Sequence, residues 1–152
     1  MIAIEFPPSA FRTRQENNID EIFDQVRKRW LVLTPEEWVR QNFIAYLIEV
    51  AGVPASLISI EREVAIGELK KRFDLVVFGR TGLPWMLVEC KAMEVQLSDK
   101  TISQMLSYFS GMPARFAVIT NGSYTYGWKM AANECLPLNE FPPYPLVFPD
   151  TV

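Results

Sequence analysis

The twenty residues from Arg72 to Lys91, RFDLVVFGRTGLPWMLVECK, contain two apolar runs separated by a Gly- and Pro-containing turn. Apolar runs of this length bounded by turn residues predict two strands, over 72–78 and 85–91. Each run carries charge where a buried strand is expected to be apolar: Asp74 in the first, Glu89 and Lys91 in the second. Because side chains alternate along a strand, Glu89 and Lys91 are predicted to share one sheet face. Charges on buried strands are costly unless they are paired or bind a metal, so these three need an explanation.

Helices and further strands are predicted on both sides of this stretch. Apolar spacing of three and four predicts a helix over 18–31. Thr34 followed by Pro35, with Glu37 three residues after Thr34, predicts the start of a second helix that ends near Gly52. The remaining predicted elements are a strand over 58–66, a helix over 98–110 and strands over 116–120 and 123–130. We therefore predict an α/β domain with a mixed central sheet flanked by helices.

The chain of 152 residues contains no His. This excludes Ser-His-Asp and Cys-His nucleophile systems and His-ligated zinc sites. Two Cys residues lie too far apart for a Cys-x-x-Cys motif, and a disulfide is only weakly indicated. With no apolar run long enough to span a membrane and no signal-peptide pattern, we expect a cytoplasmic protein that does not bind membranes.

The net charge of −3 belongs to the C-terminal end. Residues 131–152 contain Glu134, Glu140 and Asp150, no Lys or Arg, and five of the eleven Pro residues. We therefore divide the chain into a domain over 1–130 and a Pro-rich, apolar extension over 131–152. The extension is expected either to pack across the domain or to bind a protein partner or a second copy.

Two basic triplets lie within the neutral body, Arg27–Arg29 and Lys70–Arg72. Such short triplets usually mark solvated ends of helices and strands. The functional alternative is phosphate contact, which depends on local rather than net positive charge.

Two interpretations of Asp74, Glu89 and Lys91 are open from the residues alone. Lys91 could simply form ion pairs with the two carboxylates at a sheet edge. Alternatively, an Asp in an apolar strand, a turn and then Glu-x-Lys in the next strand form a catalytic set. The Glu-x-Lys tripeptide is common by chance, but the whole arrangement is more specific.

The arrangement of Asp74, Glu89, Cys90 and Lys91 resembles the PD-(D/E)xK nuclease superfamily, and more narrowly the N-terminal nuclease domain of type I restriction enzyme R subunits. The similarity covers roughly residues 27–130. It rests on five segments: Thr34-Pro-Glu-Glu-Trp-Val-Arg-Gln41, Arg72-Phe-Asp-Leu-Val-Val-Phe78, Leu87-Val-Glu-Cys-Lys91, Gln104-Met-Leu-Ser-Tyr108 and Val118-Ile-Thr-Asn-Gly122. Phe73 stands where the superfamily name has Pro.

This resemblance implies a restriction-endonuclease-like fold and Mg²⁺-dependent hydrolysis of DNA, with Mn²⁺ as a substitute. Asp74, Glu89 and the main-chain carbonyl of Cys90 would hold the ion. Lys91 would position the nucleophile or stabilise negative charge. The family R subunits also contain an ATP-driven motor, but the 152 residues contain no phosphate-binding Gly-x4-Gly-Lys-Ser/Thr loop.

Three further residues gain a role from the resemblance. Gln104 and Tyr108 lie four apart on one predicted helix face. They are either an ordinary polar flank or the Gln-x3-Tyr signature that lies beside the catalytic site and contacts DNA. Glu37 could lie near the metal, or its carboxylate could cap its own helix.

An inactive binding or assembly module with the same fold is the alternative function. It would explain the missing motor and the neutral body. It predicts a partner that buries the segment Phe141–Phe148.

Overall fold

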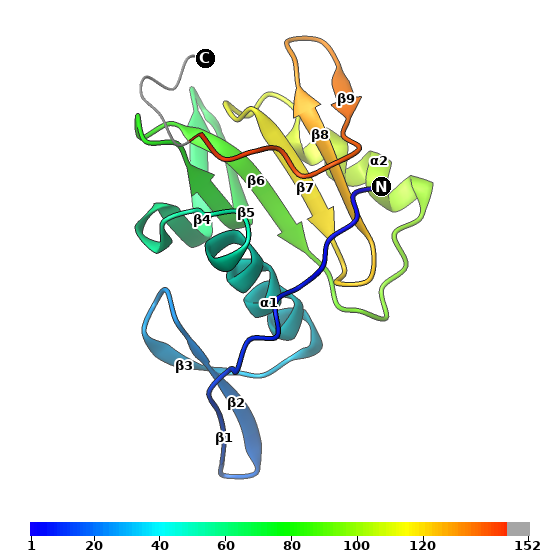
Figure 1. The fold of residues 1–152 in the computed structure, drawn as a ribbon. Coiled ribbons are helices and arrows are strands. Elements are labelled where there is room, and N and C mark those ends of the chain that lie inside the picture. Colours follow the sequence, from blue (N-terminus) through cyan, green and yellow to red (C-terminus); the bar gives the residue numbers. More distant parts are fainter. Residues whose placement is uncertain (146–152) are drawn as a thin grey trace.

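The computed structural model describes residues 1–145, whose centre is a six-stranded sheet (Figure 1). Its strands follow the order β4-β5-β6-β7-β8-β9, and only β6 and β7 are parallel. The strands are β4 Ile58–Ile66, β5 Leu69–Phe78, β6 Pro84–Cys90, β7 Phe116–Thr120, β8 Thr125–Met130 and β9 Cys135–Pro137. The five strands predicted from sequence are all present, and β9 is an addition from the C-terminal extension.

Two helices cover opposite faces of this sheet. Helix α1 spans Pro35–Glu49 and begins as predicted, with the Thr34 hydroxyl accepting from the Glu37 N–H at 3.0 Å. Helix α2 spans Asp99–Phe109 and provides the crossover between the parallel strands β6 and β7, and Ser98 caps it. A short 3-10 helix, Ala55–Leu57, connects α1 to β4. The predicted α/β class, a mixed central sheet flanked by helices, is therefore confirmed.

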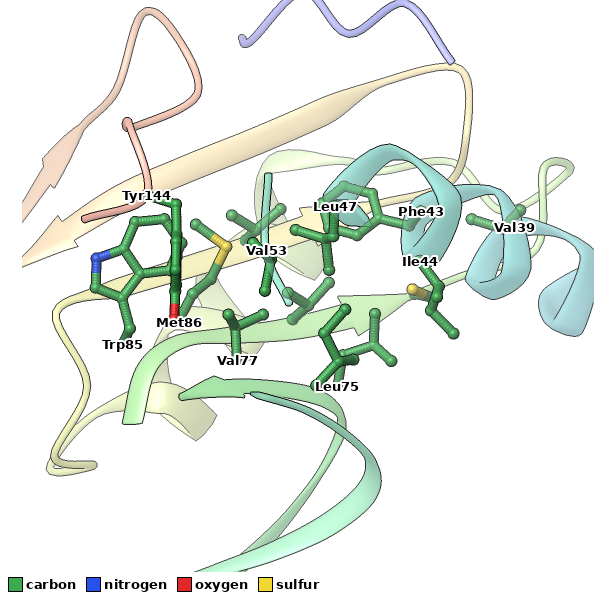
Figure 2. Close-up of a cluster of buried hydrophobic side chains, with 14 residues drawn as sticks. Val39, Phe43, Ile44, Leu47, Val53, Leu75, Val77, Trp85, Met86 and Tyr144 are labelled. Carbon is green, nitrogen blue, oxygen red and sulfur yellow. The ribbon is translucent and has the colours of Figure 1, made fainter. Parts of the chain in front are cut away.

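The larger hydrophobic core lies between α1 and the sheet (Figure 2). From α1 it contains Val39, Phe43 and Leu47, each at most 1% exposed. These side chains pack on Leu75 and Val77 of β5. The contact fixes β5, the strand that carries Asp74, against α1. The side chains in this cluster are Val39, Phe43, Ile44, Leu47, Val53, Ile58, Leu75, Val77, Trp85, Met86, Val88, Cys90, Val118 and Tyr144.

A second core lies on the opposite face, under α2. The Phe109 ring stacks on the Phe73 ring with centroids 5.6 Å apart, and Val76, Leu87 and Ile119 complete the centre. This core places the start of β5 against the end of α2.

The helix predicted over 18–31 is wrong. These residues form β2 Ile19–Asp24 and β3 Arg29–Val32, which join β1 Thr13–Glu16 in a separate three-stranded antiparallel sheet. Asn17 and Asn18 adopt positive φ values of 52° and 64°, a conformation that Asn tolerates and that closes a tight β-turn. The apolar residues matched helical spacing by coincidence; on β2, Ile22 and Asp24 are buried on one face.

Asp24 anchors this N-terminal sheet to α1. Its carboxylate is fully buried and accepts from the N–H groups of Val26 and Arg27 at 2.8 and 2.9 Å, which closes the turn before β3. The other oxygen accepts from Arg27 Nε at 2.9 Å and from Gln41 Nε2 of α1 at 3.2 Å. Figure 1 shows the sheet beyond the first turn of α1.

The described part of the C-terminal extension packs across the domain, one of the two outcomes expected from its composition. After β9, Phe141 contacts the rings of Phe43, Tyr46 and Trp85. Tyr144 is 4% exposed, lies edge-on to Trp85 at 5.1 Å and donates to the Phe78 carbonyl at 2.8 Å. Within the segment predicted to meet a partner, this chain thus buries Tyr144 and partly buries Phe141; Leu146–Phe148 lie outside the described residues.

Both thiols are unpaired, with Cys90 buried and Cys135 half-buried. No helix within residues 1–145 is long and apolar enough to cross a membrane.

Asp24→Ala should release the N-terminal sheet, because it removes the buried carboxylate that Arg27 and Gln41 share and that joins the sheet to α1. Breaking such a buried pair costs about 3–5 kcal/mol. We expect faster trypsin cleavage within Arg27–Arg29, measured by timed digestion and mass spectrometry. The exposed Asp20→Ala in the same sheet is the control, and equal cleavage rates for the two variants would contradict this role of Asp24.

Tyr144→Phe should lower the free energy of unfolding by about 1–2 kcal/mol, because the Phe78 carbonyl loses its donor. Urea denaturation measures the change. Tyr124→Phe removes a hydroxyl from a side chain that is 53% exposed and should change stability by less than about 0.5 kcal/mol. A Tyr144→Phe effect as small as that of the control would show that the extension is not fixed by this bond.

Candidate active site

The β5–β6 ladder ends where Asp74 and Glu89 face each other. The last regular pair is Leu75 with Val88. Beyond it, the Asp74 N–H donates to Glu89 Oε1 at 3.0 Å, and the Cys90 N–H donates to Asp74 Oδ2 at 2.7 Å. Each carboxylate thus accepts from the main chain of the opposite strand, which holds the two acids side by side.

This proximity has an electrostatic consequence. Burial, and then the negative charge of Asp74, raise the pKa of Glu89 to about 8, although the Lys91 ammonium lowers it in part. Two carboxylates held together in a half-buried place favour either a proton or a cation between them.

Lys91 lies two residues after Glu89, just beyond the end of β6. Its N–H donates to the Thr120 carbonyl at 2.8 Å, which extends the β6–β7 pairing. Its ammonium is near enough to influence Glu89 but forms no ion pair with any carboxylate among residues 1–145. The interpretation in which Lys91 merely neutralises Asp74 and Glu89 is therefore not what this part of the chain shows.

The cation that does pair with Asp74 is Arg40 of α1, whose side chain is 8% exposed. Its guanidinium lies 3.4 Å from Asp74 Oδ1, 3.2 Å from Glu37 Oε1 and 3.5 Å from Glu61 Oε1. Burial acts to lower the pKa of Arg40, but the carboxylates of Glu37 and Asp74 outweigh it and raise that pKa. Arg40 thus remains charged and connects α1, β4 and β5 at the site.

Glu61 joins the same network through an unusual backbone conformation. Its φ of 51° interrupts the β4–β5 pairing opposite Asp74, between the Ile60–Leu75 and Arg62–Phe73 pairs. The carboxylate pairs with Arg27 at 3.1 Å as well as with Arg40, and these cations lower its pKa despite partial burial. Nothing in the sequence singles out Glu61, because a positive φ at Glu carries no composition signal. Arg40 has a signal, since it lies four and three residues after Glu36 and Glu37 on one helix.

Glu37 is 8% exposed and belongs to this network rather than to a capping box. Its carboxylate accepts from Arg40 Nη1 and Gln41 Nε2, both at 3.2 Å. The Thr34 N–H donates instead to the Val32 carbonyl at 3.1 Å. Of the two roles considered for Glu37, the structure places it beside the candidate site, one guanidinium away from Asp74.

Tyr108 and Gln104 are both exposed, but only Tyr108 forms side-chain hydrogen bonds with β5. The Tyr108 hydroxyl donates to the Arg72 carbonyl at 2.9 Å and accepts from the Arg72 N–H at 3.1 Å. The Tyr108 ring also contacts Phe73, next to Asp74. Gln104 shares the helix face, and its side chain forms no hydrogen bond with another described residue. Tyr108 therefore holds the strand that leads into Asp74, two residues before it.

The donors at the site suit a small hard cation. Within residues 1–145, no three Asp, Glu or Cys side chains converge on a common metal position. Mg²⁺ needs fewer, since it is commonly bound by one or two carboxylates with water and substrate oxygens. The Cys90 N–H points to Asp74, and the N–H and carbonyl of one strand residue share an edge, so the Cys90 carbonyl faces the same side. Its thiol is buried in the α1 core, as its alternation with Glu89 predicts.

Comparison with known proteins gives one family match. The family model for the type I restriction enzyme R protein N terminus matches residues 35–142, which is more than half of the chain. The match includes α1, the whole six-stranded sheet and α2, and begins after the N-terminal sheet. A search of curated proteins finds no match. The matched region contains Arg40, Asp74, Glu89 and Lys91, and the chain belongs to the type I restriction enzyme R protein N-terminal family.

Proposed function

We propose that this chain is a Mg²⁺-dependent deoxyribonuclease domain of the PD-(D/E)xK type that acts in restriction of DNA. The observation that carries the proposal is the pairing of Asp74 with Glu89, held together by main-chain bonds of 3.0 and 2.7 Å across β5 and β6. Family membership supports the connection to restriction. The absence of His from the sequence is compatible with this chemistry, which uses carboxylates and Lys.

Asp74, Glu89 and the Cys90 carbonyl would hold the metal ion, with Mn²⁺ as a substitute for Mg²⁺. When bound, the ion supplies a water of lowered pKa and neutralises charge on the phosphoryl oxygens. The raised pKa of Glu89, caused by burial and by the charge of Asp74, means that the pair favours a positive charge at this place, either a proton or a metal ion.

Lys91 and Arg40 have different tasks in this proposal. Lys91 has no ion-pair partner within residues 1–145, so its ammonium is available to a phosphate oxygen or to the attacking water. Arg40 is buried and faces four carboxylates, including that of Glu36 at 3.6 Å, so it orients Asp74 rather than substrate.

An inactive binding or assembly module is the second candidate, and one observation favours it. Both oxygens of Asp74 have partners within the chain, Oδ2 from Cys90 and Oδ1 from Arg40. A site in which Arg40 permanently satisfies Asp74 would bind no metal. The 3.4 Å separation from Arg40 is long for a charge-assisted hydrogen bond, which favours the catalytic candidate.

Asp74→Asn and Lys91→Met should each reduce Mg²⁺-dependent DNA cutting by at least about 100-fold, since the first removes a charged metal ligand and the second removes a cation at the reacting phosphate. The assay uses linear, circular, single-stranded and methylated DNA with Mg²⁺ or Mn²⁺, followed on gels. Lys129→Met, an exposed change on β8, is the matched control and should cut like the wild type. Cutting that survives Asp74→Asn would assign the activity to a contaminant.

Mn²⁺ should raise the melting temperature of the wild type but not that of Asp74→Asn or Glu89→Gln. A ligand at about 100 times its Kd adds about 2.7 kcal/mol to stability, well within reach of differential scanning fluorimetry. Glu63→Gln, an exposed change on β4, should keep the full shift. A wild type whose melting temperature ignores Mn²⁺ would favour the inactive module.

A further inference from the structure

Two basic segments that are far apart in the sequence meet at one carboxylate beside the candidate site. Arg27, in the turn between β2 and β3, places Nη1 3.1 Å from Glu61 Oε2. Arg72 of β5 places Nη2 3.7 Å from the same oxygen. Glu61 also pairs with Arg40, which contacts Asp74, so both basic triplets lie next to the catalytic carboxylates.

Each triplet divides into cations that the fold uses and cations that it leaves exposed. Arg27 and Arg72 bind Glu61, and Lys71 Nζ donates to the Tyr108 carbonyl at 2.6 Å. The remaining three, Lys28, Arg29 and Lys70, are exposed and form no ion pair among residues 1–145. Exposed cations gathered from two elements carry a local positive charge that the net charge of −3 conceals.

The positions of these three cations fit a polyanion that passes over the site. Lys70 lies four residues before Asp74 on β5, about 13 Å along the strand. Lys28 and Arg29 directly follow Arg27, which reaches Glu61 from the N-terminal sheet. A DNA backbone carries a phosphate at every nucleotide and can contact both segments at once.

We infer that Lys28, Arg29 and Lys70 form a phosphate-binding surface that holds the DNA backbone beside the Asp74–Glu89 pair, on the side of β4 and Glu61. This inference rests on the proposed nuclease function, because the carboxylate pair is what selects a nucleic acid over an acidic protein. Two of the three cations, Lys28 and Arg29, come from the N-terminal sheet, which precedes the family match at residue 35. The sheet therefore adds substrate contacts to the family domain, and Asp24 and Arg27 fix it in place for that role.

The test is the salt dependence of binding to a fluorescein-labelled DNA duplex, measured by anisotropy. Ca²⁺ replaces Mg²⁺, and recovered DNA is run on a gel to verify that it is intact. Each lost phosphate contact lowers the slope of log K against log salt by about 0.9. Lys28→Gln with Arg29→Gln should lower it by about 1.8, Lys70→Gln by about 0.9, and the triple variant by about 2.7. Each variant should also bind DNA more weakly at a fixed salt concentration.

The control is Arg115→Gln with Lys129→Gln, two exposed cations at the opposite end of β6 from Glu89, and its slope should equal that of the wild type. Circular dichroism checks that every variant is folded. A triple variant with the slope of the control would overturn the inference, as would a loss confined to one segment or a wild type that does not bind DNA. Cutting by the wild type in Mg²⁺ with unchanged slopes would reject the surface and keep the nuclease. Lowered slopes without cutting would reject the nuclease and keep the surface.

Discussion

The site depends on the way in which β5 and β6 separate at Asp74 and Glu89. Two main-chain N–H groups that would otherwise continue the ladder donate to the carboxylates instead. Each acid is thereby satisfied and fixed, and the pair retains an electrostatic demand for a proton or a cation. The cores on the two sheet faces make this possible, because Leu75 packs under α1 while Phe73 packs under α2.

Two arginines, Arg40 and Arg27, pair with the carboxylates at and around this site. Arg40 of α1 forms ion pairs with Asp74, Glu37 and Glu61. Arg27 of the N-terminal sheet forms an ion pair with Glu61. Buried pairs of this kind seldom add net stability, but removing one partner is strongly destabilising. The network of ion pairs therefore serves mainly to position α1, β4, β5 and the N-terminal sheet around the carboxylates. It leaves Lys91 without an ion-pair partner in the described chain.

Sequence patterns located five of the six strands of the larger sheet, its two helices and the caps at Thr34 and Ser98, because alternation and capping are local signals. The same patterns failed over 18–31, where the apolar spacing fitted a helix and the turn at Asn17 and Asn18 became evident only from their positive φ values. Proximity of Asp74 to Glu89 followed from strand pairing, whereas Glu61 and Arg40 depend on a positive φ and on helix placement. The C-terminal extension was expected either to pack across the domain or to bind a partner. The contacts of Phe141 and Tyr144 with Trp85, which are tertiary, decide for packing in its described part.

The most direct measurement of the central claim is anomalous diffraction from crystals soaked in Mn²⁺. The account predicts an anomalous peak coordinated by Asp74, Glu89 and the Cys90 carbonyl, with the Lys91 ammonium beside it and Arg40 still facing Glu37 and Glu61. Crystals with no peak at this position, and with Arg40 still on Asp74 at saturating Mn²⁺, would contradict it.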